Sequence, residues 1–190
     1  MQRLISYGLL IAGFLLLYGC ISASMTGASA VYDRYRLENK WTDHTIVLQI
    51  KQKIQNDSVF IGSDLDISSF NQRVLLTGQT TSKTARQKAA RIAATTAQVK
   101  HVYNFIELLP PLSSERIMND AWITTQIKST IIAKAEMDPE QIKIVTEDGV
   151  VYLMGTLTHQ QAKQAVYIAQ YTPGVKRVVK IFRYIVLTNK

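Results

Sequence analysis

Isoleucines that recur at every fourth position mark two stretches of the chain as helical. The two series are Ile46, Ile50 and Ile54, and Ile123, Ile127 and Ile131. Because an α-helix has about 3.6 residues per turn, side chains four apart lie on one face. Each series therefore predicts an amphipathic helix with a buried isoleucine stripe, the second one over residues 120–134. Asp43 and Asp120 are the predicted N-caps, since a short acidic side chain accepts hydrogen bonds from the first helical turn.

Alternating apolar and polar residues after each helix predict a β-hairpin. The strands cover residues 65–67 and 74–76 in the first half of the chain, and 141–145 and 150–154 in the second. Asp148-Gly149 is a tight-turn sequence between the later pair. Asn71-Gln72 is a looser turn between the earlier pair.

Small and apolar residues spaced by three and four follow each hairpin and predict a second helix. They are Ala85, Ala89 and Ile92 in the first half, and Ala162, Val166 and Ala169 in the second. A final apolar strand is predicted over 102–109 and over 178–187. Each half then has the order αββαβ, which can pack two helices on one face of a three-stranded sheet.

The two halves are copies of one unit. Nine residues recur 77 positions later: Asp43, Ile46, Gln49, Ile50, Lys51, Ile54, Val74, Leu76 and Gly78 match Asp120, Ile123, Gln126, Ile127, Lys128, Ile131, Val151, Leu153 and Gly155. The offset becomes 76 where residues 99–102 match residues 175–178, so one residue has been lost in the second copy. So many coincidences at one offset indicate an internal repeat. The predicted fold class is α+β, with tandem αββαβ units that each have a three-stranded mixed sheet and two helices on one face.

The composition is that of a globular protein, and its net charge favours an anionic partner. The 190 residues are 47% apolar and 19% charged, which excludes a disordered or collagen-like chain. Lys and Arg total 22 against 14 Asp and Glu, and the resulting charge of +8 favours lipid headgroups or nucleic acid. The single cysteine excludes a disulfide framework within one chain and any CxxC redox or zinc site.

The N-terminus has the pattern of an export signal. Arg3 is the only charge before the uncharged stretch 4–18, which is shorter than the about 20 apolar residues of a membrane-spanning helix. Residues 17–20 resemble a bacterial lipobox, from which Tyr18 departs by its size. The resemblance implies signal cleavage before Cys20 and acylation of its sulfur, and two or three acyl chains anchor a protein stably. The alternative is an uncleaved helix in which Cys20 is an ordinary small residue.

These features divide the chain into five segments. They are a signal peptide at 1–19, a lipidated tether at 20–40, the first unit at 41–109, a linker at 110–116 and the second unit at 117–190. The tether shows no sustained period. Pro110-Pro111 marks the linker, because prolines end strands and stiffen connectors. With Ile21 and not Asp after the acylated cysteine, the lipobox resemblance implies sorting to the outer membrane, with both units in the periplasm.

The units resemble the BON domain, named after bacterial osmotically inducible and nodulation proteins. Its pattern is a hairpin ending in Val-x-Leu-x-Gly, a second helix and a closing Gly-Val-x-x-Val, found here at 74–78, 151–155 and 174–178. The first unit has Gln98 where the family's glycine is expected before Val99. Two such units behind a lipobox resemble the dual BON-domain outer-membrane lipoproteins of Gram-negative bacteria. The resemblance implies a non-enzymatic protein that contacts anionic phospholipid through the first helix of its second unit and supports outer-membrane integrity.

The outward face of that helix has the composition of a membrane-interface contact. It lies opposite the isoleucine stripe and carries Trp122, Thr125, Lys128, Ser129 and Ile132. An indole ring sits at headgroup depth and a lysine meets phosphate. These five side chains are therefore the predicted binding site for an anionic, phosphatidylglycerol-like membrane.

The first unit provides an internal comparison for this face. Thr45 stands where the second unit has Trp122, so the fold does not require a large apolar residue there. The alternative is that Trp122 packs at the joint between the units or covers the end of the sheet, since aromatic residues at polar rims are frequent interface residues.

No catalytic or metal-binding motif accompanies these features. His44, His101 and His159 each lack a counterpart in the other unit and have no companion ligand at the required spacing. No phosphate loop, nucleophile elbow or HExxH motif is present. We therefore expect neither an enzyme nor a cofactor.

A periplasmic scaffold is the alternative function, in which the BON surfaces bind an envelope protein or peptidoglycan. The second helix of the first unit has a basic side that either function could use, formed by Lys83, Arg86, Lys88 and Arg91. Nucleic acid would also suit the positive charge. It is not an expected partner, because an exported protein rarely meets it.

Overall fold

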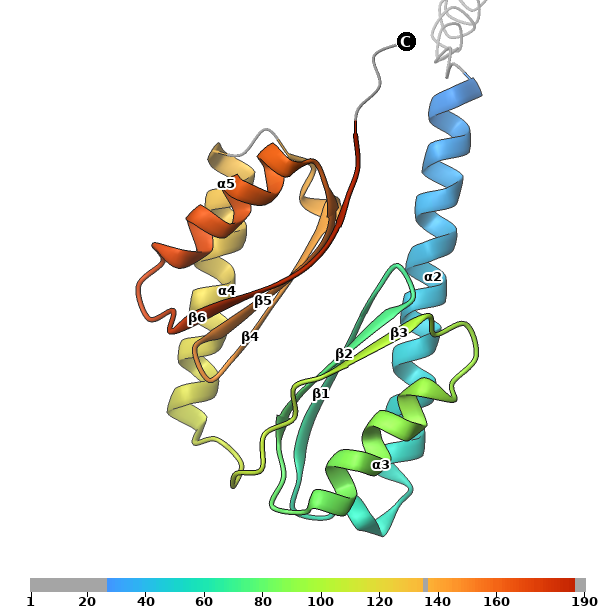
Figure 1. Ribbon diagram of the computed structural model, residues 1–190, viewed down its shortest axis with the longest axis vertical. Coiled ribbons are helices and arrows are strands. Elements are labelled where there is room, and N and C mark those ends of the chain that lie inside the picture. The colour runs from blue at the N-terminus through green and yellow to red at the C-terminus, as the bar shows by residue number, and fades with distance from the viewer. Residues whose placement is uncertain (1–26, 135–136, 187–190) are drawn as a thin grey trace, which may run out of the picture. The chain divides into compact units, whose positions relative to one another are not determined.

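Two copies of an αββαβ unit make up the compact part of the chain. The computed structural model describes residues 27–134 and 137–186 (Figure 1), and one compact unit begins at Asn39 and includes both copies. The first copy contains α2 (Gly27–Gln55), β1 (Asp64–Phe70), β2 (Arg73–Gln79), α3 (Lys83–Ala94) and β3 (His101–Asn104). The second contains α4 (Ser114–Lys134), β4 (Ile142–Glu147), β5 (Val150–Leu157), α5 (His159–Gln170) and β6 (Arg177–Tyr184). The predicted fold class is confirmed.

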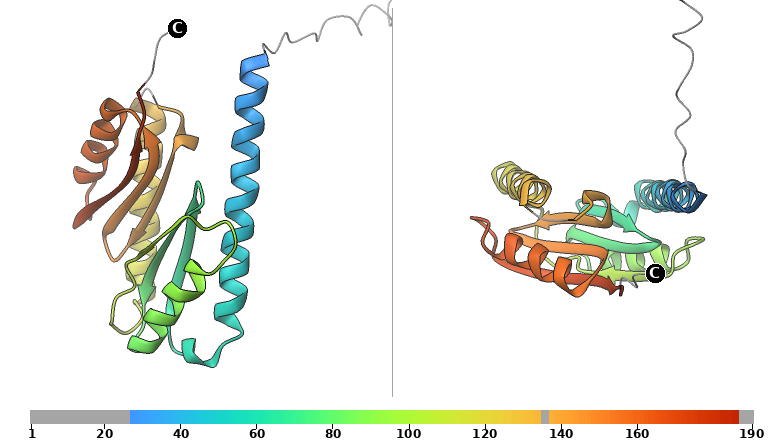
Figure 2. Two further views of the ribbon diagram at one scale, coloured as in Figure 1. Left: turned by 45° about the vertical axis from the view of Figure 1, so that its right-hand side comes forward. Right: turned by 90° about the horizontal axis from the view of Figure 1, so that it is seen from above.

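Each sheet has three strands and mixed direction. The strand orders are β1-β2-β3 and β4-β5-β6, with an antiparallel hairpin followed by a parallel pair. Short 3-10 turns, η2 (Ser58–Phe60) and η3 (Pro139–Gln141), join the first helix of each unit to its hairpin. Both sheets show the usual strand twist (Figure 2).

The predicted isoleucine stripes form the core of each unit. All six isoleucines are buried against one face of their own sheet, together with three alanines of the second helix. The alanines are Ala85, Ala89 and Ala93 in α3, and Ala162, Ala165 and Ala169 in α5. Alanine at these positions lets the helix approach the sheet closely. Ile92 and Val166, which were predicted to lie on this face, are only partly buried at its margin.

The prediction that Asp43 and Asp120 are helix N-caps is wrong. Both lie inside their helices, and their carboxylates instead bind the backbone of the hairpin turn. Asp120 accepts hydrogen bonds from the amides of Asp148 (2.6 Å) and Gly149 (2.8 Å). Asp43 accepts them from the amides of Asn71 (2.7 Å) and Gln72 (2.8 Å), and from the hydroxyl of Ser69 (2.6 Å). Each aspartate therefore binds a turn that begins 28 residues further along the chain. The spacing of residues in the sequence does not reveal so distant a hydrogen-bond partner.

Two helices start earlier than the pattern predicted. α2 begins at Gly27, so the helix extends through most of the segment predicted as a tether without regular period. α4 begins at Ser114, inside the predicted linker 110–116. Once a stripe of buried isoleucines has nucleated a helix, each further residue adds a hydrogen bond at little cost. The preceding residues therefore join the helix even where they carry no apolar stripe.

The lost residue of the second copy lies in the connection from the hairpin to the second helix. Three residues separate β2 from α3, whereas Thr158 alone separates β5 from α5. Ser82 and Thr158 are the matching N-caps, and Thr95 and Tyr171 the matching C-caps. The offset of 76 therefore applies from this connection onward, so that His159 corresponds to Lys83.

The closing strands and one turn depart from the prediction in three details. β6 ends at Tyr184 and not at residue 187. β3 ends at Asn104 and not at residue 109, although a bridge from Glu107 to Gln79 continues the pairing. Gln98 has a φ of 67°, the left-handed conformation that Gly174 adopts in the second unit at 85°. The turn expected of the family's glycine thus forms without one.

The second face of each sheet packs against the other unit. Leu75 of β2 is buried in one cluster with Tyr152, Met154 and Ile181 of the second unit. The rings of Phe105 and Tyr152 lie 5.0 Å apart between centroids. Because β5 is covered on both faces, its residues read as an unbroken apolar run and not as an alternating one.

Candidate functional site

All five predicted membrane-contact residues lie on the exposed side of α4. Trp122 is 47% exposed and Ile132 is 65% exposed, and Thr125, Lys128 and Ser129 are exposed between them. This placement follows from the isoleucine stripe, which fixes the opposite side of the helix against the sheet. These exposed fractions match the predicted orientation of the helix, and the membrane contact of the five residues stays a prediction.

The small polar residues of this face turn their hydroxyl groups back onto the helix. Thr125 donates to the carbonyl of Ala121 (2.9 Å), and Ser129 donates to the carbonyl of Gln126 (3.0 Å). A hydroxyl that is already bonded to the backbone costs less to transfer out of water than a free one. The indole and the isoleucine side chain thus project from a surface whose two hydroxyl groups are already bonded to the helix backbone.

Lys128 supplies positive charge at the edge of the face. It forms no ion pair within the described part of the chain. Its side chain is exposed, so its ammonium group is available to a phosphate.

Sequence reasoning missed one residue of the face. Met118 is 72% exposed and lies one turn before Trp122, on the same side of α4. It was missed because the helix was predicted to begin at Asp120. The spacing of four between Met118 and Trp122 was the available signal.

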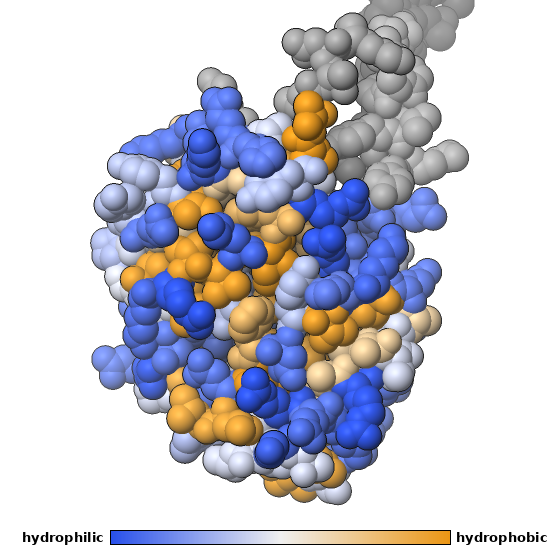
Figure 3. Space-filling model, in the orientation of Figure 1, coloured by the Kyte–Doolittle hydropathy of each residue, from blue (hydrophilic) through white to orange (hydrophobic). Residues whose placement is uncertain are grey.

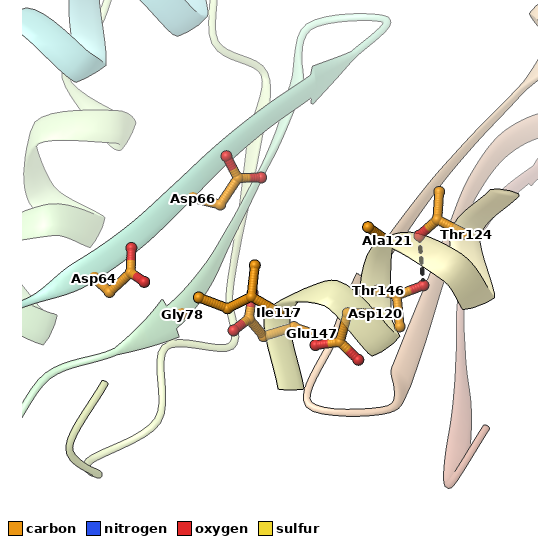
Figure 4. Close-up of a pocket in the computed structure, with 9 residues that line it drawn as sticks. All are labelled: Asp64, Asp66, Gly78, Ile117, Asp120, Ala121, Thr124, Thr146 and Glu147. Carbon is orange, nitrogen blue, oxygen red and sulfur yellow. Dashed lines mark hydrogen bonds between the residues drawn. The ribbon is translucent and has the colours of Figure 1, made fainter. Parts of the chain in front are cut away.

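Another side of α4, between the exposed face and the isoleucine stripe, borders an acidic pocket. It has a volume of about 410 Å³, and its lining residues are Asp64, Asp66, Gly78, Ile117, Asp120, Ala121, Thr124, Thr146 and Glu147 (Figure 4). Asp64 and Asp66 come from β1, and the other two carboxylates come from the second unit. Asp120 already binds the hairpin turn. No group of acidic, histidine or cysteine side chains suited to a metal ion occurs in residues 38–134 and 137–186.

Glu147 is the pocket residue whose protonation is most affected by the fold. Burial raises the pKa of Glu147, and the carboxylates of Asp120, Asp64 and Asp66 raise it further. The amide of Gln79 donates a hydrogen bond of 2.7 Å to its carboxylate and acts in the opposite direction. Among the described residues, the side chain of Gln79 in the first unit is thus the hydrogen-bond donor that stabilises the charged form of Glu147 in the second unit.

The other predicted features have ordinary structural surroundings. The ring of His101 contacts Tyr103, and that of His159 stacks on Tyr184 at 4.2 Å between centroids. On the basic side of α3, Lys88 forms an ion pair with Asp57. Apolar residues form separate patches among polar ones on the face shown in Figure 3.

The N-terminal predictions fall outside the structure. Cys20 and the signal segment lie before residue 27, outside the described residues. Within the described residues, no helix combines the length and the apolar character needed to cross a membrane.

Comparison with known proteins agrees with the repeat. The BON domain profile matches residues 42–110 and 119–185. Outer membrane lipoprotein DolP of Haemophilus influenzae is 30% identical over 183 residues, covering 93% of this chain and 94% of that protein. The 21 kDa hemolysin of Actinobacillus pleuropneumoniae is 35% identical over 121 residues, covering 64% of this chain and 62% of that protein. Among solved structures, CdsD of the Chlamydia trachomatis type III secretion system covers 74% of this chain and 92% of its own, with 12% identity and a TM-score of 0.31.

Proposed function

The chain belongs to the BON-domain family, with one BON domain over residues 42–110 and a second over 119–185, and we propose that it is a non-enzymatic outer-membrane lipoprotein that binds anionic phospholipid. In this proposal, acyl chains on Cys20 anchor the protein with its domains in the periplasm, and the outward face of α4 binds the headgroups. This contact would support the integrity of the outer membrane. The observation that carries the proposal is the exposure of Trp122 and Ile132 on a helix whose opposite side is fully buried.

The physical case rests on what the exposed groups prefer. A tryptophan ring is most stable at the boundary between headgroups and acyl chains, where its apolar body and its N–H are both accommodated. Lys128 adds attraction to an anionic surface, worth about 1 kcal/mol for a basic residue close to the headgroups. A phospholipid bilayer supplies both environments at one surface.

The relatives support the anchor. A protein named as an outer membrane lipoprotein is similar to this chain over nearly its whole length. The Gly19-Cys20 boundary is where acylation would occur. Mass spectrometry of the membrane-extracted protein tests this step, because an unmodified Cys20 or an intact Met1 would contradict it.

Sedimentation with vesicles tests the lipid contact. The chain from residue 20, with Cys20→Ser in every sample so that no acyl chain contributes, is mixed with vesicles that contain phosphatidylglycerol or only phosphatidylcholine. We expect binding that requires the anionic lipid and weakens with salt. Trp122→Glu should lower the affinity about tenfold or more, because it removes the ring and adds a repelled charge.

The first BON domain supplies the matched control. Thr45→Glu introduces the same charge at the equivalent helical position, which is also exposed, and should leave vesicle binding nearly unchanged. Both variants should keep a melting temperature close to that of the unsubstituted chain, since exposed substitutions usually change stability by about 0.5 kcal/mol or less. Equal losses for the two variants would show a general charge effect and contradict a specific α4 contact. Binding to neither vesicle would instead favour a protein or peptidoglycan scaffold.

A further inference from the structure

A second aromatic surface lies on α5 of the second BON domain. Tyr167 is 63% exposed and Tyr171 is 73% exposed, and their ring centroids are 4.5 Å apart. In residues 38–134 and 137–186, neither phenol hydroxyl has a hydrogen-bond partner. Two large rings one helical turn apart thus remain in contact with solvent.

We propose that Tyr167 and Tyr171 form a second part of the membrane contact and enter the headgroup region together with the α4 face. This inference rests on the proposed function, because it assigns further binding residues to the same phospholipid surface. Like tryptophan, tyrosine places an apolar ring and a polar tip at the membrane interface. The unpartnered phenol hydroxyls can bond to phosphate or carbonyl groups of the lipid.

The repeat shows that the fold does not require these tyrosines. The shared N-cap and C-cap positions align α5 with α3 at an offset of 76, so Tyr167 corresponds to Arg91 and Tyr171 to Thr95. In the first BON domain a cation and a small polar residue therefore stand at these positions. The same contrast separates Trp122 from Thr45, and in both cases the aromatic residue belongs to the second domain.

The two aromatic surfaces are close to each other. α4 and α5 pack on the same face of the sheet, and their buried side chains share one core. The loop after α5 contacts α4, because a Cβ on Gly174 would lie 3.0 Å from Cδ1 of Ile123 and 3.6 Å from Nδ2 of Asn119. Ile123 is the neighbour of Trp122, and Tyr171 precedes Gly174 by three residues. The C-terminal end of α5 therefore adjoins the part of α4 that carries Met118 and Trp122.

The charge of α5 suits an anionic surface. Lys163, Tyr167 and Tyr171 follow one another at intervals of four residues, and all three are exposed. α5 contains no acidic residue. A lysine one turn before two tyrosines is the same combination of cation and ring that Lys128 and Trp122 provide on α4.

The test uses the vesicle assay with a double substitution. Tyr167→Ser with Tyr171→Thr removes both rings, and threonine copies the residue that the first BON domain has at this C-cap. We expect the affinity for phosphatidylglycerol vesicles to fall about tenfold, with little change in the melting temperature. Trp41→Ser is the control, because Trp41 is a highly exposed aromatic residue of the first domain, and it should leave the affinity unchanged.

The outcomes separate this inference from the proposed function. If Trp122→Glu abolishes binding while the double variant binds as the unsubstituted chain does, the α4 contact stands and the α5 inference is overturned. Tyrosines that serve a protein partner would give the same unchanged vesicle binding. If neither variant affects binding, both are overturned. A loss in the double variant that equals the loss in Trp41→Ser would also overturn the inference, since any exposed aromatic residue would then have the same effect.

Discussion

At the scale of single residues, Gly78 is the glycine of the first BON domain whose position leaves least room for a side chain. Its φ is 101°, and a Cβ at this position would lie 2.1 Å from the carbonyl oxygen of Asp64. Any side chain would therefore push β1 away from β2. Gly155 is its counterpart, but its backbone is not left-handed and a Cβ there would meet its neighbours at 3.1 Å.

Gly78→Ala should destabilise the protein by about 3 kcal/mol or more, because it combines backbone strain with a clash against main-chain atoms. Gly155→Ala should cost about 1 kcal/mol, because the Leu157 side chain and the carbonyl oxygen of Gln141 would each have to move by only a few tenths of an ångström. Urea denaturation followed by circular dichroism measures both changes. Similar values for the two variants would contradict the backbone argument.

At the scale of elements, an aspartate on the first helix of each BON domain holds the hairpin turn of the sheet. Asp120 links α4 to the turn at 148–149, and Asp43 links α2 to the turn at 71–72. Both turns have positive φ at their two central residues, as two-residue hairpins require. The carboxylate accepts the backbone N–H groups that this conformation leaves unpaired.

Asp120→Ala should lower the free energy of unfolding by about 2–4 kcal/mol, because one buried and one partly buried amide lose their acceptor. Asp120→Asn should cost less, since the amide oxygen still accepts one of the bonds. Asn119→Ala, on the neighbouring exposed residue, is the control and should change stability by about 0.5 kcal/mol or less. Thermal unfolding measures all three, and a neutral Asp120→Ala would contradict the turn-binding role.

At the scale of the whole molecule, the contact between the two BON domains is apolar at its centre and acidic at one side. Leu75 and Tyr152 hold equivalent positions in the repeat and lie in one cluster. Phe105 and Ile181 are likewise equivalent and both join this cluster. The two domains therefore use equivalent positions to contact each other, while Asp64 and Asp66 of the first domain and Glu147 of the second line the acidic pocket.

Glu147 should make the free energy of unfolding fall as the pH rises, which is opposite to the usual effect of a carboxylate. Its folded pKa is raised above the ordinary value of 4.5, so the folded protein binds more protons than the unfolded chain between these two values. The contribution of Glu147 to the stability of the folded protein is therefore favourable below about pH 4.5 and is lost as the pH rises through the folded pKa.

Glu147→Gln should stabilise the protein at pH 7 and remove this part of the pH dependence, because the amide oxygen still accepts the bond from Gln79 without carrying charge. The measurement is the difference in Tm between the variant and the unsubstituted chain from pH 4.5 to pH 8. Glu115→Gln, on an exposed residue, should show no such trend. A constant difference across the range would contradict a raised pKa.

Among the candidate site residues, the sequence identified those whose exposure follows from the position of the buried isoleucines on the same helix. Trp122, Lys128 and Ile132 were placed on the outward face because the isoleucine stripe defines the opposite side. Met118 was missed because the helix start was misplaced. Tyr167 and Tyr171 were not singled out, because helical phase alone does not show that the C-terminal end of α5 adjoins the part of α4 that carries Trp122.

The sequence by itself determined the repeat, the order αββαβ, the hairpins and the buried stripes, because these follow from local periodicity and turn chemistry. Only the tertiary structure decided which groups far apart in the chain bind each other. It showed that Asp43 and Asp120 bind turns and not helix ends, and that Tyr152 is covered by the other domain. A periodic pattern shows which face of an element is apolar, but the partner of each remaining face depends on how the chain folds back.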